Sequence, residues 1–427
     1  MSTDSSTAKK LIELYSSHKK FGDVLKDIAP GDPSTFPAAP ELPPITSWTE
    51  ESKAKRLAFL RQQSTTKLEH LSGSKALPGA DEYKGNIENL IGFTQVPTGL
   101  VGPLHISGTR AKGDYYVPFA TTEGALVASY NRGARATRLS GGITSVCTTE
   151  RVQRTPVWHF ENLAQVGEFL NWTLQQLDVF RKVVSEVSRY ARLEDLRLNM
   201  EGNHILTVFE YSCGEAAGQN MVTICTEAIC QYIVSAAPVK PLHWFIESNY
   251  SGDKKATAVA FAAVRGKKVT AEAVVHRSVV KEVLNSTPED IVRYWQSSVV
   301  AAAQSNSIGI QGHFANGLTA IFLACGQDVA CISEAHVGIT RMELNSANEL
   351  YVAITLPALV VGTVGGGTGL PTQKECLELI ECTGPGSARK LAEICGAAAL
   401  AGELSIAAAL ASGQFSKAHK IFGRKRK

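Results

Sequence analysis

One stretch of the chain combines a strand-like segment, a glycine-bounded loop and a helical segment. The residues HILTVFEYS (204–212) are rich in β-branched and aromatic side chains, which is typical of a β-strand. A loop runs from Gly214 to Gly218, and a helix is predicted from Asn220 to about Ile233. This geometry presents the free amides of a helix N-terminus, which bind anions such as phosphate. The chain is therefore expected to contain a unit of mixed α and β structure with a candidate anion site.

Other segments also follow helix and strand patterns. Residues 267–275 (KKVTAEAVV) are predicted to form a strand, and Thr287 before Pro288 predicts the start of a helix that runs beyond Trp295. Residues 160–191 have a helical period, which predicts helix. Its apolar positions are Leu163, Val166, Phe169, Leu170, Leu174, Leu177, Phe180 and Val183.

The N-terminal part differs from the rest of the chain in residue composition. Residues 1–28 are predicted to include a short amphipathic helix with Leu11, Leu14 and Tyr15 on one side. Six prolines between residues 30 and 44 indicate a linker or an extended arm. Residues 47–72 are polar and lysine-rich, and we expect them to be helical.

Length and composition indicate a globular protein of several domains. At roughly 150 residues per domain, 427 residues predict two or three domains. Apolar residues make up 44% and charged residues 19%, so the chain is neither disordered nor fibrous. The net charge is only +3, which gives no support to broad electrostatic binding of nucleic acid or of an anionic membrane.

Neither a membrane span nor a secretory signal is predicted. No run reaches the roughly 18 uninterrupted apolar residues that a span requires, and the nearest candidate, Gly396–Gly413, contains Glu403. Residues 1–20 lack the apolar block of a secretory signal. The nine cysteines form no Cys-x-x-Cys pair, so each is expected to be a buried small hydrophobic residue in a reducing cytosol. We therefore expect a cytoplasmic protein.

The glycine cluster GTVGGGTG (362–369) is the most prominent local motif. It does not fit the Gly-x-Gly-x-x-Gly dinucleotide pattern, and it lacks the lysine of a phosphate loop. Glycine-rich turns are often only places where two backbones approach closely. The cluster alone indicates either such an approach or a site for a planar or phosphorylated group.

Four ionisable residues stand in unusual surroundings. Glu123 lies among small residues, where a carboxylate at a helix start is the ordinary alternative. Lys254 has Lys255 beside it in a polar loop, where lysines are usually just exposed. Asp328 interrupts an apolar run, so it is either a structural cap or an acid poised by burial. For His419 the ordinary alternative is a lone surface histidine. No metal-ligand spacing such as His-Glu-x-x-His is present, so no metal site is predicted.

Six motifs follow one another along the chain. They are ENLIGFTQVPTGLVGPL (88–104), TTEGALVASYNRGARA (121–136), NYSGDKKATA (249–258), HFANGLTAIFLACGQDVA (313–330), GTVGGGT (362–368) and LAGELSIAAALASGQFSKAH (400–419). Taken together and in order, they resemble the motifs of 3-hydroxy-3-methylglutaryl-CoA reductases, and look closest to the soluble catalytic portion of the class I enzymes. The resemblance runs from about residue 85 to the C-terminus.

The resemblance implies a four-electron reduction of hydroxymethylglutaryl-CoA to mevalonate, with two NADPH consumed and free CoA released. It gives Lys254 the role of stabilising the oxyanion and Glu123 that of the proton-donating acid, with Asp328 tuning both. His419 would protonate the departing CoA thiolate.

The resemblance also implies binding residues. Substrate contacts fall at Arg154, Asn249, Asp253, Lys255 and Asn316, and CoA contacts at Ser129, Asn131 and Arg132. Cofactor contacts fall at Ser188, Arg189, Glu215, Gly218, Asn220, Gly365, Gly366, Gly367 and Arg424.

The implied fold is α/β (α+β), with a large domain built around a long central helix and an inserted ferredoxin-like cofactor domain. The boundaries expected here are a helical N-terminal region with its Pro-rich linker, a large domain in two pieces, the inserted NADP-binding domain, and a connecting substrate loop. They fall at 1–85, 86–153 with 256–427, 154–246, and 247–257. Active sites of the family form between subunits, so a homodimer or homotetramer is implied.

Three departures from the family motifs bear on the substrate and the cofactor. The family sequence DAMGMN reads EAAGQN at 215–220, so both methionines are absent. Glu247 stands where the family has a serine before the substrate loop, and Gln296 falls where a second substrate-binding lysine is expected. Reduction of a different acyl-CoA therefore stays open as an alternative, as does an inert relative that serves as a binding subunit. Arg293, one turn earlier, could compensate for Gln296.

Overall fold

The computed structural model describes residues 12–13 and 19–415, so His419 and Arg424 lie outside the described residues, as do Leu11, Leu14 and Tyr15. Within that part, ten strands form one continuous sheet, whose main path runs β7-β4-β6-β3-β8-β10-β9, with β1 and β5 attached at its sides and β2 beyond β1. The strands are β1 (Thr98–Gly108), β2 (Lys112–Ala120), β3 (Ile143–Arg154), β4 (Val157–His159), β5 (Arg192–Glu201), β6 (His204–Ser212), β7 (His243–Phe245), β8 (Gly266–Val275), β9 (Ile339–Leu344) and β10 (Leu350–Leu359).

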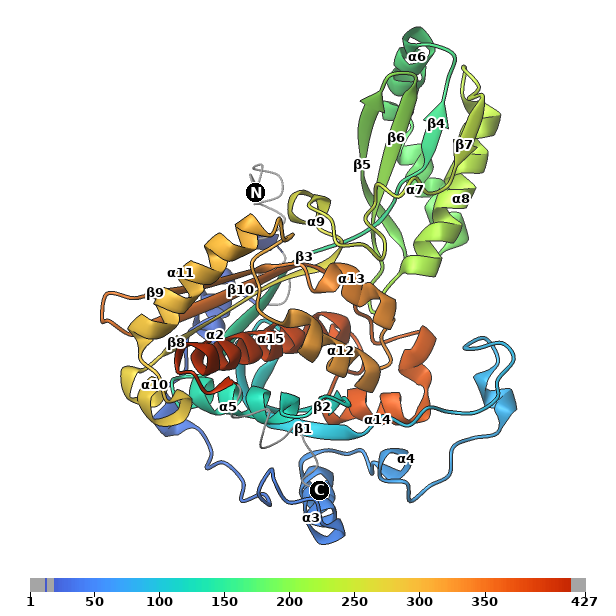
Figure 1. The fold of residues 1–427 in the computed structure, drawn as a ribbon. Coiled ribbons are helices and arrows are strands. Elements are labelled where there is room, and N and C mark those ends of the chain that lie inside the picture. Colours follow the sequence, from blue (N-terminus) through green and yellow to red (C-terminus); the bar gives the residue numbers. More distant parts are fainter. Residues whose placement is uncertain (1–11, 14–18, 416–427) are drawn as a thin grey trace.

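Strand β3 connects the two halves of this sheet. Its residues Thr144 to Arg151 pair antiparallel with β8, and its last residues, Val152 to Arg154, pair with β6. The unit formed by β4 to β7 and their helices therefore projects from the end of β3, as Figure 1 shows at the upper right. Arg154 lies where the chain enters this unit.

A long buried helix, α15 (Ser387–Ala411), forms the centre of the larger half. It packs against helices α5 (Leu126–Arg138), α11 (Pro288–Gln304) and α12 (Phe314–Ala324), and against strands β3, β8 and β10. The approach of α5 depends on Gly133, where a Cβ atom would overlap the Ala401 carbonyl of α15. Small residues thus let the helices come close enough to fill the core.

Two buried glutamates of α15 accept backbone hydrogen bonds from other segments. Glu393 accepts from the amides of Arg110 and Ala111, both at 2.8 Å, in the turn between β1 and β2. Glu403 accepts from the amides of Gly312 and His313, both at 2.7 Å, at the start of α12. The two acids therefore fix the loops around the central helix.

Helix α15 also bears on the membrane question. Among the described residues it is the one helix long and apolar enough to cross a membrane, by length and composition, which the sequence had not predicted. However, 83% of its apolar window is buried inside the protein. The core helix of a soluble protein passes the same test, so this is weak evidence for a span.

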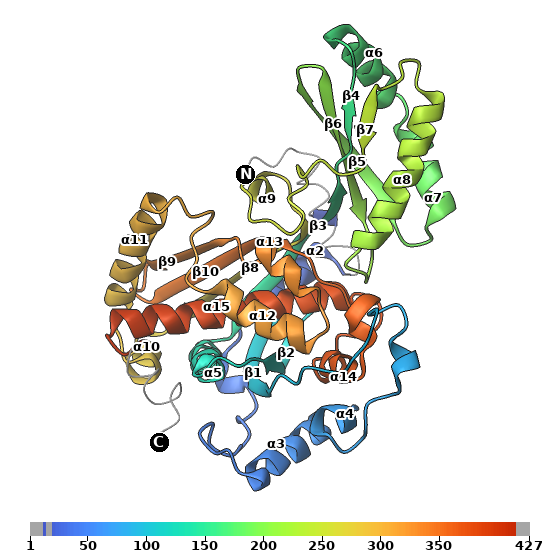
Figure 2. The ribbon, with the colours of Figure 1, turned by 45° about the vertical axis from the view of Figure 1, so that its right-hand side comes forward.

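The projecting unit has its own apolar core. Helices α6 (Leu163–Leu174), α7 (Leu177–Val187) and α8 (Gln219–Ala236) cover one face of its sheet (Figure 2). The predicted strand over 204–212 and helix from Asn220 are confirmed as β6 and α8. The helix predicted over 160–191 is wrong in one respect, because it is broken at Gln175 and Gln176. Glutamine is compatible with a helix, and the apolar period continues across both residues. The sequence pattern therefore gives no sign of this break.

The N-terminal part runs along the larger half as an extended arm. The arm is held there by a hydrogen bond from Gly31 N to Gly141 O at 2.9 Å and by Phe36, whose ring stacks on His105 at 3.7 Å. Its elements are α2 (Phe21–Ile28), η1 (Pro33–Thr35), α3 (Glu50–Gln63), α4 (Glu69–Ser72) and η2 (Ala80–Tyr83). The remaining elements are α9 (Val259–Ala262), α10 (Arg277–Leu284), η3 (Val329–Cys331), α13 (Ile332–Ala335), η4 (Gly366–Gly369) and α14 (Pro371–Leu379).

Several further predictions are confirmed. Strand β8 covers the predicted 267–275, and α11 begins at Pro288 with the Thr287 side chain accepting from Asp290 N. All nine cysteines are buried and free.

Candidate active site

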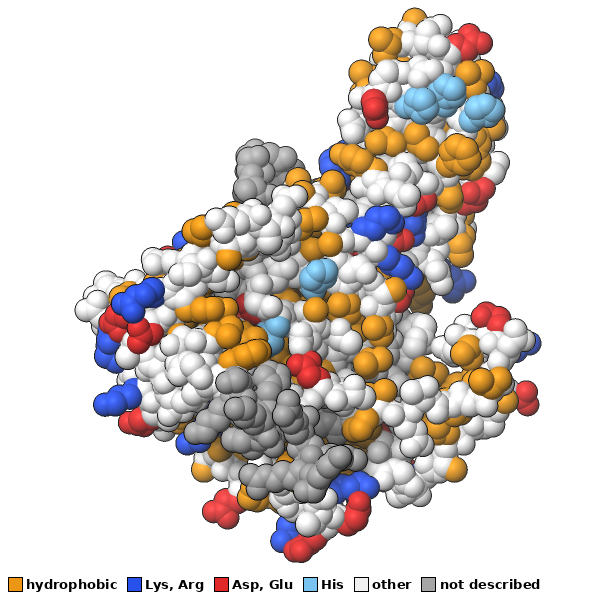
Figure 3. Space-filling view, viewed as in Figure 1, with side chains coloured by type: hydrophobic (Ala, Val, Ile, Leu, Met, Phe, Trp, Pro, Cys, Tyr) orange, Lys and Arg blue, Asp and Glu red, His pale blue; other side chains and the backbone are white. Residues whose placement is uncertain are grey.

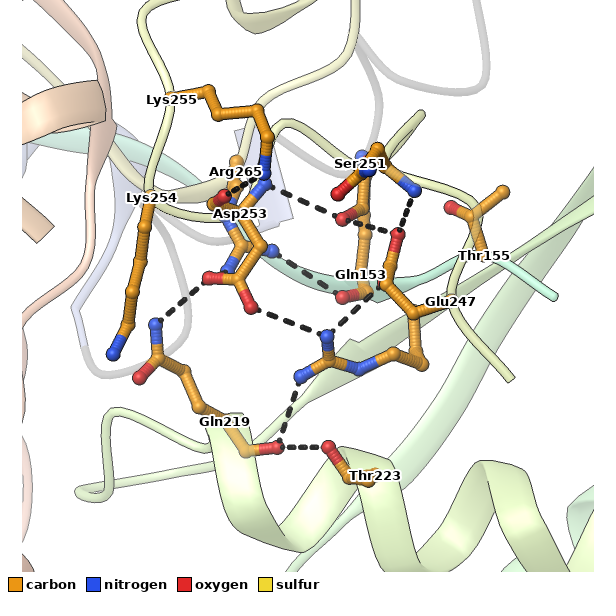
Figure 4. Close-up of polar contacts among 12 residues, drawn as sticks. Gln153, Thr155, Gln219, Thr223, Glu247, Ser251, Asp253, Lys254, Lys255 and Arg265 are labelled. Atoms are coloured by element: carbon orange, nitrogen blue, oxygen red, sulfur yellow. Dashed lines mark hydrogen bonds and ion pairs between the residues drawn. The ribbon is translucent and has the colours of Figure 1, made fainter. Parts of the chain in front are cut away.

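Arg154, at the end of β3, joins three segments. Its side chain is 8% exposed, and Nη1 forms ion pairs with Glu247 Oε2 at 3.0 Å and with Asp253 Oδ2 at 3.2 Å (Figure 4). Its Nη2 also donates to the carbonyl oxygen of Gln219, the first residue of α8, at 3.4 Å. The expected substrate arginine is thus paired with two carboxylates of the chain itself.

Asp253 is held on both sides by arginines. Its second oxygen, Oδ1, lies 2.5 Å from Arg265 Nη2 and accepts from Gln219 Nε2 at 3.2 Å. Although burial opposes the charge, Arg265 and Arg154 lower the pKa of Asp253 below its ordinary value. The carboxylate is therefore ionised at neutral pH, and the loop that carries it is fixed.

Lys254 follows directly and forms an ion pair with Asp328. Its Nζ lies 2.9 Å from Asp328 Oδ2, and the two side chains are 47% and 42% exposed. The hydrogen bond to Asp328 raises the pKa of Lys254. Asp328 also accepts from Ala330 N at 3.0 Å and so caps η3. Of the two alternatives for this acid, the cap is confirmed and burial is wrong. The pair places a permanent cation beside open solvent.

Glu123 has a different hydrogen-bond partner from Lys254 and Asp328. It is exposed, and its Oε2 accepts from Asn316 Nδ2 at 2.6 Å. Asn316 lies in the first turn of α12, whereas Asp328 comes after the end of that helix. Among the described contacts, none joins Glu123 to Lys254.

The expected CoA-contacting residues fasten α5 to its neighbours. Ser129 Oγ lies 3.0 Å from Ser405 Oγ of α15, and Arg132 donates to Ser405 O at 2.6 Å. Asn131 accepts from Gly102 N of β1 at 2.9 Å. These side chains therefore have structural partners in addition to any ligand.

The two glycine motifs lie against each other. Thr363 N donates to Glu215 O at 2.7 Å, and a Cβ at Gly362 would overlap the Ala217 amide. The ordinary interpretation of the glycine cluster, close backbone approach, therefore holds at Gly362. Next to it, Gly365 and Gly366 have positive φ and open space around their α-carbons.

Glu215, an expected cofactor residue, caps the central helix instead. Its carboxylate accepts from Gly386 N at 2.6 Å and from Ala388 N at 2.7 Å, and Ser387 Oγ donates to it at 3.1 Å. Its oxygens are thereby used at the N-terminus of α15, where negative charge is stabilised by the helix dipole. This carboxylate is not positioned as a ligand group.

The other expected cofactor residues gather at one end of the projecting unit. Gly218 is the N-cap of α8, has positive φ and offers no side chain to cap the helix. Asn220, in the first turn, is exposed. Ser188 ends α7 and accepts from Ala191 N at 3.0 Å, and Arg189 is exposed beside it. Residues 188–192 lie near this turn because Arg192 pairs with Ser212.

The remaining loop residues are solvent-facing. Asn249 and Lys255 are both exposed; Asn249 N donates to Glu247 Oε1 at 2.9 Å, and Lys255 Nζ donates to the Asp253 carbonyl at 3.0 Å.

Gln296 is exposed on α11, and Arg293 pairs with Asp290 at 2.8 Å. Arg293 is therefore engaged on the surface of its own helix.

Sequence reasoning missed three residues of this network. Gln219 ties α8 to the loop, and Arg265 and Glu334 lie beneath Asp253, with their side chains only 2% and 1% exposed. An arginine at the end of the apolar run AVAFAAV was the available signal for Arg265, because a charge is rarely buried without a partner.

Comparison with known proteins identifies the family. The family model for hydroxymethylglutaryl-coenzyme A reductase matches residues 52–424. The 3-hydroxy-3-methylglutaryl-coenzyme A reductase of Pyrococcus horikoshii is 42% identical over 377 residues, covering 86% of this chain and 91% of that protein. The Aeropyrum pernix enzyme of the same name is 41% identical over 380 residues, covering 88% and 90%.

Solved structures agree on the fold. The class II reductase of Streptococcus pneumoniae bound to NADPH superposes with a TM-score of 0.68 at 21% identity, covering 85% of this chain and 99% of that one. That enzyme is of class II rather than the class I type that the motifs favoured, and the likeness speaks for the fold alone. With the family model and the archaeal relatives, it follows that the chain belongs to the hydroxymethylglutaryl-coenzyme A reductase family of oxidoreductases.

Proposed function

We propose that this protein reduces the thioester of (S)-3-hydroxy-3-methylglutaryl-CoA to the alcohol mevalonate, with two NADPH and two protons consumed and CoA released. The observation that carries this proposal is the Lys254–Asp328 pair at 2.9 Å, half-exposed and next to the arginine-bound loop. Each hydride transfer to a carbonyl carbon leaves negative charge on its oxygen, and a fixed ammonium stabilises that charge.

The chain's own groups divide the remaining work. Asp328 keeps Lys254 protonated, so that the lysine can face the oxyanion as a cation. Glu123, with its carboxylate oriented by Asn316, donates the proton, and His419 protonates the CoA thiolate. Arg154, Asn249, Asp253, Lys255 and Asn316 bind the acyl part, and Ser129, Asn131 and Arg132 bind CoA.

NADPH supplies the hydride when it is bound, and the α8 end of the projecting unit suits its phosphates. The first turn of α8 has no side-chain cap, which leaves amide donors available to an anion. Arg189 is an exposed cation beside it. We assign Ser188, Arg189, Gly218, Asn220, Gly365, Gly366, Gly367 and Arg424 to this site. Glu215 is left out because its carboxylate caps α15.

The same assignment divides the chain into domains. Residues 154–246 form a ferredoxin-like cofactor domain, supported by a separate apolar core and an antiparallel sheet with helices on one face. Residues 86–153 and 256–427 form the large domain around α15, residues 247–257 the substrate loop between them, and residues 1–85 the N-terminal region.

A homodimer or homotetramer with sites between subunits is part of the proposal. Ile87, Ile91 and Phe93 are 52%, 103% and 49% exposed in the segment before β1. Figure 3 shows hydrophobic side chains on this side of the molecule, where the segment projects at the lower right. Such apolar groups are stabilised by burial against a second subunit.

We place the enzyme in the cytoplasm.

A second candidate is the same reduction of a different acyl-CoA. Arg154 is already paired with Glu247 and Asp253, and the chain has Gln296 where a cation was expected. Each change could weaken binding of a substrate carboxylate by ~1–3 kcal/mol. An acyl group without a carboxylate would avoid this cost.

The test is NADPH oxidation at 340 nm with hydroxymethylglutaryl-CoA, a panel of other acyl-CoAs, and NADH in parallel. Two NADPH consumed per CoA released, with hydroxymethylglutaryl-CoA alone, supports the first candidate; turnover only with another thioester supports the second. Lys254→Ala should abolish turnover, while Lys53→Ala, an exposed lysine of α3, should not. Turnover unchanged in Lys254→Ala would refute the mechanism.

A further inference from the structure

The two segments that carry Lys254 and Asp328 are joined by a second, buried connection. Asp253 pairs with Arg265 Nη2 at 2.5 Å, and Arg265 Nε lies 3.3 Å from Glu334 Oε1. Asp253 directly precedes Lys254, and Glu334 lies in α13, which follows the 3-10 helix capped by Asp328. The chain therefore bridges the same two segments twice, once at the surface and once beneath it.

The buried bridge has the geometry of a rigid link. The side chains of Arg265 and Glu334 are 2% and 1% exposed, and Arg265 Nη1 also donates to the Gln153 carbonyl at 3.3 Å. A guanidinium presents its donors in a fixed planar fork, so partners on three atoms fix its orientation. The other carboxylate oxygen of Glu334, Oε2, is buried and has no hydrogen-bond partner among the described residues.

The surface pair cannot hold its own geometry. Half-exposed ion pairs contribute only ~0–1 kcal/mol, because water competes for both partners and two flexible side chains must be ordered. Breaking a buried pair is far more costly, since it leaves an unpaired charge in the interior. The position of Lys254 relative to Asp328 thus depends on what lies beneath them.

We propose that Arg265 and Glu334 are positioning residues that set the separation of Lys254 and Asp328. Glu334 orients Arg265, and Arg265 together with Arg154 holds Asp253, which fixes the backbone at Lys254. Neither residue touches the reacting atoms. The effect of these two residues on turnover rests on the proposed function. Their effect on the position of the Lys254 ammonium does not depend on it.

The test measures the reactivity of Lys254 without any substrate. The full-length protein is treated with trace acetic anhydride, and acetylation of each lysine is followed by mass spectrometry, with Lys53 and Lys281 as internal references. In Glu334→Ala, Lys254 should be acetylated at least threefold faster than in the wild type, because the ammonium separates from Asp328. Glu334→Gln, which still accepts from Arg265, should fall between. The matched control is Glu343→Ala, which removes an exposed ion pair with Arg341.

Steady-state kinetics provide the second measurement. If Glu334 acts by positioning, kcat in Glu334→Gln, measured at pH 8 where the wild-type carboxyl is ionised, falls at least tenfold while the KM for NADPH changes less than twofold. An unchanged rate of Lys254 acetylation in a folded Glu334→Gln protein would overturn the proposal. This variant decides the outcome even if Glu334→Ala does not fold. If the wild type oxidises no NADPH with any acyl-CoA, the proposed function fails, and the acetylation experiment still decides whether the bridge positions Lys254.

Discussion

Replacing Glu215 by alanine should destabilise the protein without weakening cofactor binding. Its carboxylate accepts from Gly386 N at 2.6 Å and from Ala388 N at 2.7 Å, at the first turn of the central helix. The backbone of the same residue accepts from Thr363 N at 2.7 Å, but alanine retains that bond. The substitution therefore removes the helix cap and little else.

The expected loss follows from the bonds that Glu215 makes. A hydrogen bond to a charged group contributes ~1.5–3 kcal/mol, and loss of a helix cap typically costs ~1 kcal/mol. Because Glu215 is partly exposed, water can replace part of the interaction. We expect the free energy of unfolding to fall by about 2–3 kcal/mol in Glu215→Ala. In Glu215→Gln, which keeps one acceptor oxygen but loses the charge at the helix N-terminus, we expect about 1 kcal/mol.

Urea unfolding followed by tryptophan fluorescence measures this loss, and hydrogen exchange at residues 386–388 shows whether the first turn of α15 frays. The control is Glu343→Ala, which removes an exposed carboxylate of β9 and should change the unfolding free energy by less than 0.5 kcal/mol. If Glu215→Ala unfolds at the wild-type urea concentration and its KM for NADPH rises tenfold, the carboxylate serves the cofactor and the capping argument is wrong.

Three further predictions follow from buried or paired groups. Burial raises the pKa of Glu334 to about 7, although Arg265 opposes the shift; the folded protein then holds this proton more tightly than the unfolded chain. Stability from this group is present below about pH 4.5 and is lost as pH rises through 7. The unfolding free energy of Glu334→Gln, minus that of the wild type, should therefore rise by up to ~3 kcal/mol between pH 5 and pH 8. Urea unfolding at each pH measures this difference, and a difference that stays constant with pH would contradict the prediction. Gly133→Ala should destabilise the protein by ~1–3 kcal/mol or more, because its Cβ would overlap the Ala401 carbonyl, and an unchanged Tm would show that α5 can shift freely. Glu247→Ser should lower the KM for hydroxymethylglutaryl-CoA about 5- to 150-fold if Arg154 binds its carboxylate, and an unchanged KM would favour a substrate without one.

The sequence predicted elements best where local pattern and packing agree. Strand β6 and helix α11 have strong local signals, and both lie where the pattern placed them. The break at Gln175 and Gln176 has no such signal, because the apolar period continues across it. For Asp328, which interrupts an apolar run, the sequence left a structural cap and burial both open. The helix ends before this residue, which leaves its side chain half-exposed and free to cap the next turn. That outcome depends on where the helix stops, which hydrophobic pattern does not determine.

The site illustrates the same limit at the level of single carboxylates. Glu215 and Glu403 lie within segments that suggested function, and Glu393 lies on the same helix as Glu403. Each of the three accepts backbone amides from a distant part of the chain. Glu375 does the same with the amides of His70 and Leu71, at 2.9 and 2.8 Å.

A carboxylate that accepts backbone hydrogen bonds on both oxygens is held in one place and has fewer acceptor sites left for a ligand. Glu123 differs, because Asn316 contacts only its Oε2 and the side chain faces solvent. Asp328 uses one oxygen for its cap and the other for Lys254, an ion pair that a substrate oxygen can approach from solvent. Residue type and motif therefore select the candidate acids, but the partners of their oxygens decide which of them can take part in chemistry.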